Sequence, residues 1–168
     1  MIGGKLELLN KLNELTEYAQ RGDEFLLEEI CNFLSNEFDL NAVVLFKVDE
    51  KGTLEVVGKS ANAKNSFHKG SSFHCDVCKL VSQNVKSSLN LDPACQIKIS
   101  ENILFEGCLL LNLSASQKML IKVARKSAFT QNDKDSLEKA LQLISTILFS
   151  WVENHGGIRS NQNSIAKI

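Results

Sequence analysis

The chain has 168 residues, the usual length of one domain, and its apolar share of 43% is ordinary for a globular protein. Its formal net charge of −1 provides no attraction to nucleic acid or to an anionic membrane, so neither is an expected partner. No apolar run approaches the ~20 residues that a membrane-spanning helix needs, and residues 1–4 lack the features of a signal peptide.

The N-terminal part of the chain predicts two helices, at residues 5–21 and 25–38. In the first helix, Leu8, Leu12 and Leu15 are separated by four and three residues and form a narrow apolar line. The second helix has a broad apolar face that is suited to packing on a sheet, made by Leu26, Leu27, Ile30, Phe33, Leu34 and Phe38.

The next segment predicts a β-hairpin, with strands at residues 42–48 and 53–60 joined by a turn at 49–52. Residues 42–46 are apolar on both faces, which is typical of a strand in the middle of a covered sheet. A further alternating stretch at residues 95–99 is suited to an outer strand.

The long connection at residues 61–94, between the strands predicted at 53–60 and 95–99, contains no convincing strand of its own. Its apolar residues are spaced as in a short helix near residues 76–85, through Val77, Leu80, Val81 and Val85. Compact domains rarely keep so long a loop unless it has a function or contains a hidden helix.

The last third of the chain predicts two strands at residues 107–113 and 119–125, followed by a helix. Thr130 and Asp133 form a capping pair, which marks the start of a long amphipathic helix that runs to about residue 154. Its apolar surface is wider than one sheet contact requires, and includes Leu137, Ala140, Leu141, Leu143, Ile144, Ile147, Leu148 and Trp151.

A hairpin that leads into a helix capped by Thr130 and Asp133 resembles the end of a GAF domain, the small-molecule sensing module of signalling proteins. The helix and hairpin in the front half agree, so the resemblance extends over roughly residues 23–154. It implies an α+β fold with a central antiparallel sheet of five to six strands. The N- and C-terminal helices are then expected on one face, and a pocket-forming crossover at about residues 61–95 on the other.

This resemblance also implies a division of labour along the chain. Residues 1–22 are an N-terminal helix and a candidate dimer contact, residues 23–154 the GAF-like domain with its exit helix, and residues 155–168 a polar tail or linker. The expected function is that of a non-catalytic sensory domain in a signalling protein, such as a histidine kinase or a cyclic-dinucleotide enzyme. It would bind a small ligand and report to an output domain in the same chain or in a partner.

The crossover holds the candidate site residues. Because the resemblance places the pocket there, the candidate ligand-binding residues are Phe67, His68, Phe73, His74, Cys75 and Cys78. Cys75 and Cys78 form a C-x-x-C motif, half of a zinc or iron–sulfur site, and His74 and Cys95 could supply the remaining metal ligands. The cofactor is thus left open between a metal ion and a small molecule, and the alternative is that these residues only pack beneath a lid.

The same cysteines allow redox chemistry. If Asp76 opens a helix, Cys75 lies at its N-terminus, where the peptide dipoles favour the thiolate, and the domain could be a redox or metal sensor. The chain also resembles free methionine sulfoxide reductases, which are stand-alone GAF proteins with a set of three cysteines. Cys75, Cys78 and Cys95 could be such a set, although their spacing and flanking residues differ from that family, so enzymatic activity stays an alternative.

The cysteines also bear on location and packing. Five cysteines without a secretory signal predict a reducing compartment, for which the cytoplasm is the default. Cys31 and Cys108 fall on apolar faces of a predicted helix and a predicted strand, so we expect both to act as small hydrophobic residues in the core.

The apolar lines on the terminal helices predict a parallel, two-fold homodimer. Its expected interface residues are Leu8, Leu12, Leu15, Leu141, Ile144, Leu148 and Trp151. Left in water, these side chains would form an apolar patch of a size that soluble monomers seldom keep. The alternative is that both lines are buried within one chain, with the first helix against the last.

Overall fold

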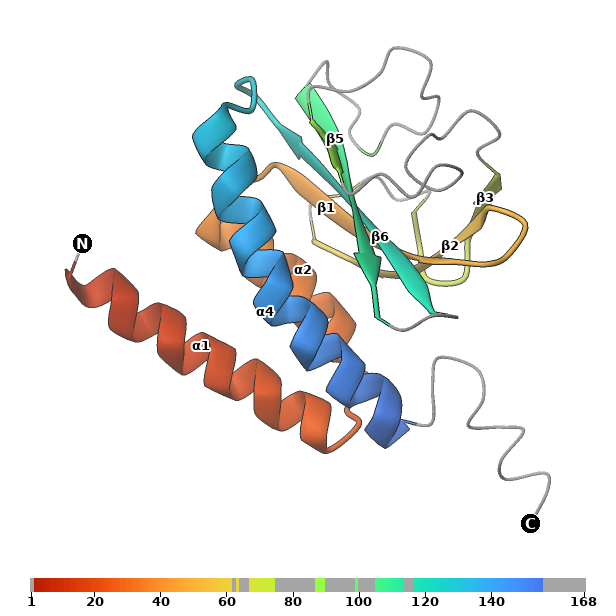
Figure 1. Ribbon diagram of the computed structural model, residues 1–168, viewed down its shortest axis with the longest axis horizontal. Coiled ribbons are helices and arrows are strands. Elements are labelled where there is room, and N and C mark those ends of the chain that lie inside the picture. Colours follow the sequence, from red (N-terminus) through yellow and green to blue (C-terminus); the bar gives the residue numbers. More distant parts are fainter. Residues whose placement is uncertain are drawn as a thin grey trace.

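The computed structural model describes residues 2–61, 63, 67–74, 87–89, 99, 105–113 and 117–155. In these residues the chain forms one sheet and three helices, labelled in Figure 1. The helices are α1 (Ile2–Gln20), α2 (Leu26–Glu37) and α4 (Gln131–His155). The strands are β1 (Ala42–Val48), β2 (Thr53–Lys59), β3 (Ser72–His74), β4 (Ser87–Leu89), β5 (Phe105–Asn112) and β6 (Lys118–Arg125).

In the described part of the chain, the sheet has six strands in the order β3-β2-β1-β6-β5-β4, and all neighbouring strands are antiparallel. The sequence places β1 correctly at the centre, because its residues are buried on both faces. β6 pairs with β1 on one side and with β5 on the other, so the C-terminal hairpin completes the sheet that the N-terminal hairpin begins.

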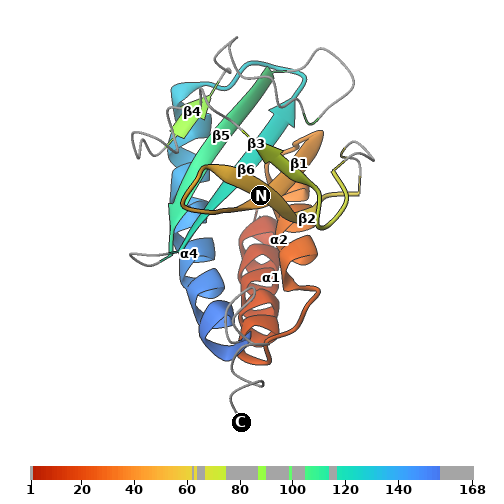
Figure 2. The same ribbon diagram turned by 90° about the vertical axis from the view of Figure 1, so that its right-hand side faces the viewer.

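All three described helices lie on one side of the sheet, as Figures 1 and 2 show together. The core between them contains the odd-numbered residues of the central strands, such as Val43, Leu45, Ile121 and Val123, together with apolar side chains of the helices. The strands alternate, so their even-numbered residues point to the other side, which we call the distal face. The fold predicted from the sequence, an α+β sheet with the terminal helices on one face, is therefore confirmed.

The first and last helices meet near their C-terminal ends. The indole Nε1 of Trp151 donates a hydrogen bond to the carbonyl oxygen of Asp23 at 2.9 Å, and Asn154 donates to the carbonyl of Ala19 at 3.3 Å. From this junction the two helices diverge toward the N-terminus of α1 (Figure 1). The intrachain alternative, with α1 against α4, is what the structure shows.

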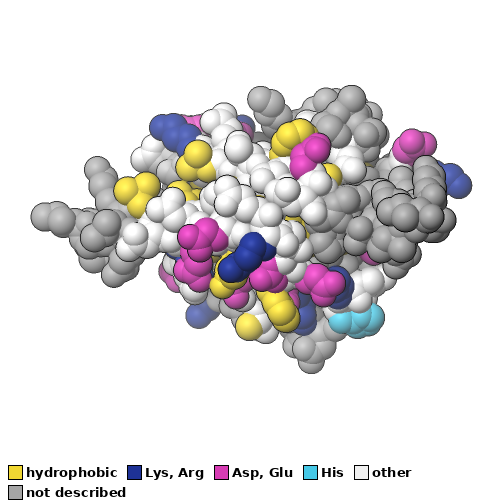
Figure 3. All heavy atoms as spheres, turned by 90° about the horizontal axis from the view of Figure 1, so that it is seen from below, with side chains coloured by type: hydrophobic (Ala, Val, Ile, Leu, Met, Phe, Trp, Pro, Cys, Tyr) yellow, Lys and Arg dark blue, Asp and Glu magenta, His cyan; other side chains and the backbone are white. Residues whose placement is uncertain are grey.

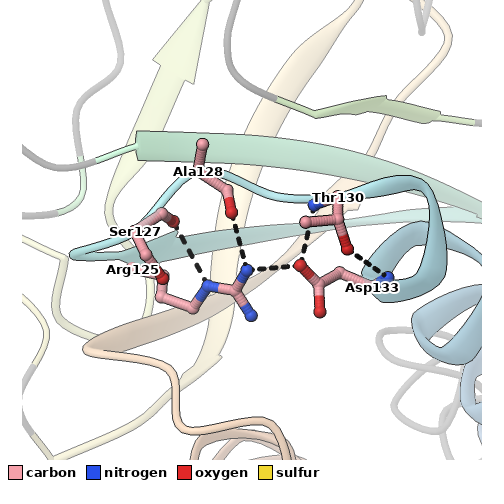
Figure 4. Close-up of polar contacts among 5 residues, drawn as sticks. All are labelled: Arg125, Ser127, Ala128, Thr130 and Asp133. Carbon is pink, nitrogen blue, oxygen red and sulfur yellow. Dashed lines mark hydrogen bonds and ion pairs between the residues drawn. The ribbon is translucent and has the colours of Figure 1, made fainter.

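The start of α4 is fixed by a polar network, shown in Figure 4. Asp133 Oδ2 accepts from the Thr130 amide at 2.7 Å, and the Asp133 amide donates to Thr130 Oγ1 at 3.1 Å, which confirms the predicted capping pair. Arg125, the last residue of β6, adds an ion pair to Asp133 and donates to the carbonyls of Ser127 and Ala128. The Arg125 hydrogen bond, followed by that of the Thr130 amide, lowers the pKa of Asp133 to about 2.

For the long connection, one prediction is wrong and two others fall largely outside the described residues. The connection does contain strands, since β3 and β4 add one short edge to each side of the sheet. Both are only three residues long, Ser-Phe-His in β3 and Ser-Ser-Leu in β4, which is too short for a recognisable apolar pattern. The helix predicted at 76–85 and most of the strand predicted at 95–99 lie outside the described residues, and Ile99 itself is in a bend.

Candidate functional site

The distal face of the sheet carries a second buried apolar layer. Its strand residues are Ala42, Val44, Phe46, Val48, Leu54, Val56, Cys108, Leu110, Leu120 and Ala124. Ala63, Phe67 and Ile99, which belong to the connections between strands, are also buried in this layer. Parts of the long connection therefore cover the distal face, as expected for a crossover that packs opposite the helices.

Three phenylalanines form an aromatic cluster on this face. The rings of Phe67 and Phe73 stack with their centroids 4.7 Å apart, and both are nearly perpendicular to the Phe46 ring, with centroids 6.1 and 6.2 Å from it. Each such aromatic pair contributes roughly 0.5–1.5 kcal/mol beyond the burial of its area. Two of the residues predicted to contact a ligand, Phe67 and Phe73, are thus brought together against the central strand.

Two ionisable side chains, Lys122 and Glu106, are buried in the same layer. Lys122 is 2% exposed and Glu106 is 1% exposed, although both are charged residue types that are rarely buried. The Nζ of Lys122 lies 3.4 Å from the Sγ of Cys108, and Glu106 Oε1 accepts a hydrogen bond from the Ile99 amide at 3.3 Å. Glu106 therefore ties the connection at Ile99 to β5.

The sheet register explains why these side chains meet. Lys122 is opposite Val44 on β1 and opposite Cys108 on β5, so it lies near the middle of the distal face. Phe46 and Glu106 are each two residues from those partners, and such diagonal neighbours are within reach of long side chains. Lys122 therefore stands between the aromatic cluster on one side and Glu106 on the other.

Charges in an apolar layer make this face chemically unusual. Taking an ammonium or a carboxylate out of water costs several kcal/mol per ion before compensation by partners. Buried ionisable groups arranged in this way occur often at binding sites, where they recognise a charged part of a ligand. The phenyl rings supply an apolar surface, and Lys122 supplies a hydrogen-bond donor for an anionic group.

Of the other predicted site residues, the structure describes only part. His68 is exposed, and its Nδ1 lies 3.1 Å from Ser71 Oγ. His74 ends β3 opposite Thr53. Cys75, Cys78 and Cys95, which complete the predicted ligand and metal sets, lie outside the described residues.

The predicted metal site therefore stays a prediction. Among the described residues, no group of three or more His, Cys, Asp or Glu side chains is arranged to hold a metal ion.

The two remaining cysteines are buried, as expected. Cys31 is fully buried in α2, and this burial raises the pKa of its thiol, which makes it unreactive. Cys108 shares the distal face with Leu110, but its contact with Lys122 was not expected from the sequence.

Sequence reasoning missed Glu106 and Lys122. A signal was present, because Lys122 interrupts the apolar strand between Leu120 and Ala124, on a face where a lysine has to be buried if the sheet is covered. Recognising it required the knowledge that β6 is a central strand, which the pairing of β6 with both β1 and β5 supplies.

The predicted interface residues lie mostly inside one chain. Leu15, Leu141, Ile144, Leu148 and Trp151 are all at most 4% exposed, because α1, α4 and the sheet cover them. Leu12 is half-buried against the same core, and the side chain of Leu8 lies outside the described part.

Other apolar side chains of the terminal helices do reach the surface. Leu9 on α1 and Leu143 and Phe149 on α4 are exposed. In the view from below in Figure 3, hydrophobic side chains form small groups among acidic and basic ones.

Comparison of the structure with solved structures identifies the fold as that of a GAF domain. The chain is similar to the phycoerythrobilin-bound GAF domain of a cyanobacterial phytochrome, with a TM-score of 0.63 and 12% identity over 87% of this chain and 96% of that one. It is also similar to the GAF domain of a phosphoenolpyruvate-protein phosphotransferase from Coxiella burnetii, with a TM-score of 0.64 and 12% identity over 96% and 98% of the two chains.

A third similar structure is an enzyme. It is free methionine-R-sulfoxide reductase from Neisseria meningitidis in complex with its substrate, with a TM-score of 0.61 and 14% identity over 86% of this chain and 87% of that one. No protein-family model and no curated protein matches the sequence. Identities this low establish the shared fold alone.

Proposed function

We propose that this chain is a sensory GAF domain that binds a small anionic ligand on the distal face of its sheet. The observation that carries the proposal is Lys122, a lysine buried in an apolar layer beside the Phe46, Phe67 and Phe73 cluster. In the proposed complex, the phenyl rings contact the apolar part of the ligand, and the Lys122 ammonium donates to its anionic group. Glu106 holds the covering connection through the Ile99 amide.

Signal output follows from the position of β6 and α4 in the chain. Lys122 is on β6, and the same strand ends in Arg125, which is bonded to Asp133 in the first turn of α4. A change in β6 on ligand binding can therefore reach α4 through five residues of connecting chain, 126–130, of which Ser127 and Ala128 accept hydrogen bonds from Arg125. In our proposal, α4 passes this change through a homodimer to an output domain of a cytoplasmic signalling protein, such as a histidine kinase or a cyclic-dinucleotide enzyme, with residues 155–168 as the linker.

A ligand screen with matched variants tests the binding proposal. Small carboxylates, phosphates and nucleotides would be screened for their effect on the thermal stability of the wild-type domain. A ligand at about 100 times its Kd stabilises the folded state by about 2.7 kcal/mol, which corresponds to several degrees of Tm. We expect Lys122→Met to abolish this shift and Phe73→Leu to reduce it.

Lys47→Met is the matched control, because Lys47 is a lysine of the neighbouring strand β1 whose partner is Glu55, at 3.6 Å. It should leave the ligand-induced shift unchanged. A shift that survives in a folded Lys122→Met variant, or a wild-type domain that responds to no anion in the screen, would contradict the proposal.

Two alternatives use residues of the crossover instead. A metal- or redox-sensing domain would use Cys75 and Cys78, with His74 and Cys95 as further metal ligands, and metal analysis of the purified protein tests it. A methionine sulfoxide reductase would use Cys75, Cys78 and Cys95, and an NADPH-coupled assay with thioredoxin tests it. The fold shared with the reductase from Neisseria meningitidis makes the second assay worthwhile.

A further inference from the structure

We propose that Cys108 and Lys122 form an oxidation-sensitive pair, which closes into a covalent nitrogen–oxygen–sulfur bridge between β5 and β6. The two residues are direct partners in the sheet register, on adjacent antiparallel strands that lie side by side in Figure 1. The Lys122 Nζ and the Cys108 Sγ are 3.4 Å apart. The reacting atoms are thus already in contact in the folded protein.

The surroundings hold the pair in this position. Both side chains are buried, at 2% and 5% exposure, within the layer formed by Val44, Leu110 and Leu120. Side chains in a packed interior have little freedom to move apart, so the two groups keep a high effective concentration toward each other. Cys31, by contrast, is equally buried but lies in α2 on the opposite side of the sheet.

The chemistry balances with dioxygen as the oxidant. The neutral amine of Lys122 loses one N–H hydrogen, and the thiol of Cys108 loses its S–H hydrogen. One oxygen atom of O₂ is inserted between nitrogen and sulfur, and the other leaves as water with the two hydrogens. Nitrogen and sulfur each give up two electrons, and the four electrons reduce the two oxygen atoms. Because the step uses the neutral amine, the Lys122 ammonium first releases one proton to solvent.

The bridge would change the distal face in two ways. It would tie β5 to β6 covalently beside the aromatic cluster, and it would replace the lysine ammonium by a nitrogen bonded to oxygen. Oxidation would then remove the group that we propose for anion binding. This consequence rests on the proposed function, but formation of the bridge does not, so each can fail without the other.

Mass spectrometry of the wild-type protein tests the bridge directly. The fully reduced protein would be divided between air-saturated and oxygen-free buffer and then analysed intact. We expect the air-exposed sample to gain one oxygen atom and lose two hydrogen atoms. After digestion, the peptides of β5 and β6 should remain joined, trypsin should no longer cleave after Lys122, and dithiothreitol should reverse both changes.

Variants assign the bridge to its two residues. Cys108→Ser and Lys122→Arg should each abolish the joined peptide, whereas Cys31→Ser should retain it. Three results would overturn the proposal: an unchanged mass with Cys108 fully alkylated after denaturation in the air-exposed wild type, oxygen gain without joined peptides, or loss of two hydrogens without oxygen gain. Because the first comparison uses the wild-type protein alone, it does not depend on the folding of any variant.

Discussion

Asp133 shows how one side chain joins two elements at the residue scale. It accepts hydrogen bonds from the Thr130 amide and from Arg125, so it caps α4 and at the same time attaches this helix to the end of β6. The Arg125 guanidinium also lies over the Phe129 ring, 4.6 Å from its centroid. The sequence contained the cap, in the spacing of Thr130 and Asp133, but nothing in the local sequence indicated that Arg125 would pair with it.

Asp133→Asn is expected to destabilise the domain by about 1 kcal/mol at neutral pH, because the amide keeps the size of the side chain but loses its charge. The folded pKa of Asp133, about 2, is below its ordinary value of 3.8. The stabilisation by the carboxylate is therefore fully present above about pH 4 and is lost as the pH falls through about 2. Urea unfolding of both proteins across this range should show their difference shrink toward acid.

Asp135→Asn provides the comparison, since Asp135 is exposed on the same helix and accepts only from the Gln131 side chain among the contacts described for it. Its effect on the free energy of unfolding should be much smaller. A difference between wild type and Asp133→Asn that stays constant from pH 7 to acid would refute the assigned role of the carboxylate.

At the scale of elements, the packing of α2 on β2 depends on close backbone contact. A Cβ added at Gly58 would lie 3.0 Å from the backbone carbon and oxygen of Leu27. Only glycine lets the helix approach the strand so closely, and this approach buries Leu27 and Ile30 over the sheet. The broad apolar face of α2 was evident in the sequence, whereas the need for glycine at position 58 became visible only when the two elements were in place.

We expect Gly58→Ala to lower the free energy of unfolding by about 2 kcal/mol, because α2 and β2 must move apart to admit the methyl group. Chemical denaturation measures this. Gly52→Ala is the comparison for backbone strain alone. Position 52 has a φ of 82° and open space around an added Cβ, so that variant strains the backbone without a steric clash. If Gly58→Ala were as stable as wild type, α2 would not be packed this closely in solution.

For the whole molecule, the structure changes how the predicted homodimer has to be built. The apolar lines on α1 and α4 are largely used inside one chain, so a second copy would meet the exposed residues beside them, Leu9, Leu143 and Phe149. Dimerisation through the terminal helices stays a prediction, now with a different set of contact residues. Substitutions of Leu143 and Leu148 should therefore differ in their effects on dimerisation and folding, because Leu143 is exposed and Leu148 is fully buried.

Light scattering at high micromolar concentration is expected to give a dimer mass for the wild type and a monomer mass for Leu143→Glu, with the fold retained. Leu148→Glu places a charge in the core, so it should instead lower the free energy of unfolding by several kcal/mol and unfold the domain. Phe105→Glu serves as the control, since Phe105 is an exposed apolar residue on the sheet and should not affect the mass. A wild-type monomer at these concentrations would reject the dimer.

Among the helices of the described residues, none combines the length and the apolar character needed to cross a membrane.

The sequence by itself determined the helices, the central strands and the cap of α4, because these depend on local periodicity and spacing. The continuous apolar stretches of β1, β5 and β6 and the amphipathic patterns of α2 and α4 are properties of neighbouring residues, so they could be recognised without the fold. The same patterns were enough to predict a GAF-like arrangement. They failed for β3 and β4, which are only three residues long and are formed by pairing with β2 and β5.

Only the tertiary structure decided which residues form the candidate site and which apolar surfaces are already covered. Glu106, Cys108 and Lys122 come together through the register of β5 and β6, and Phe46 joins Phe67 and Phe73 across three strands and a connection. Likewise, the apolar lines of α1 and α4 could be read from the sequence, but not that each would bury the other. Such contacts depend on long-range register and packing, which residues far apart in the sequence determine jointly.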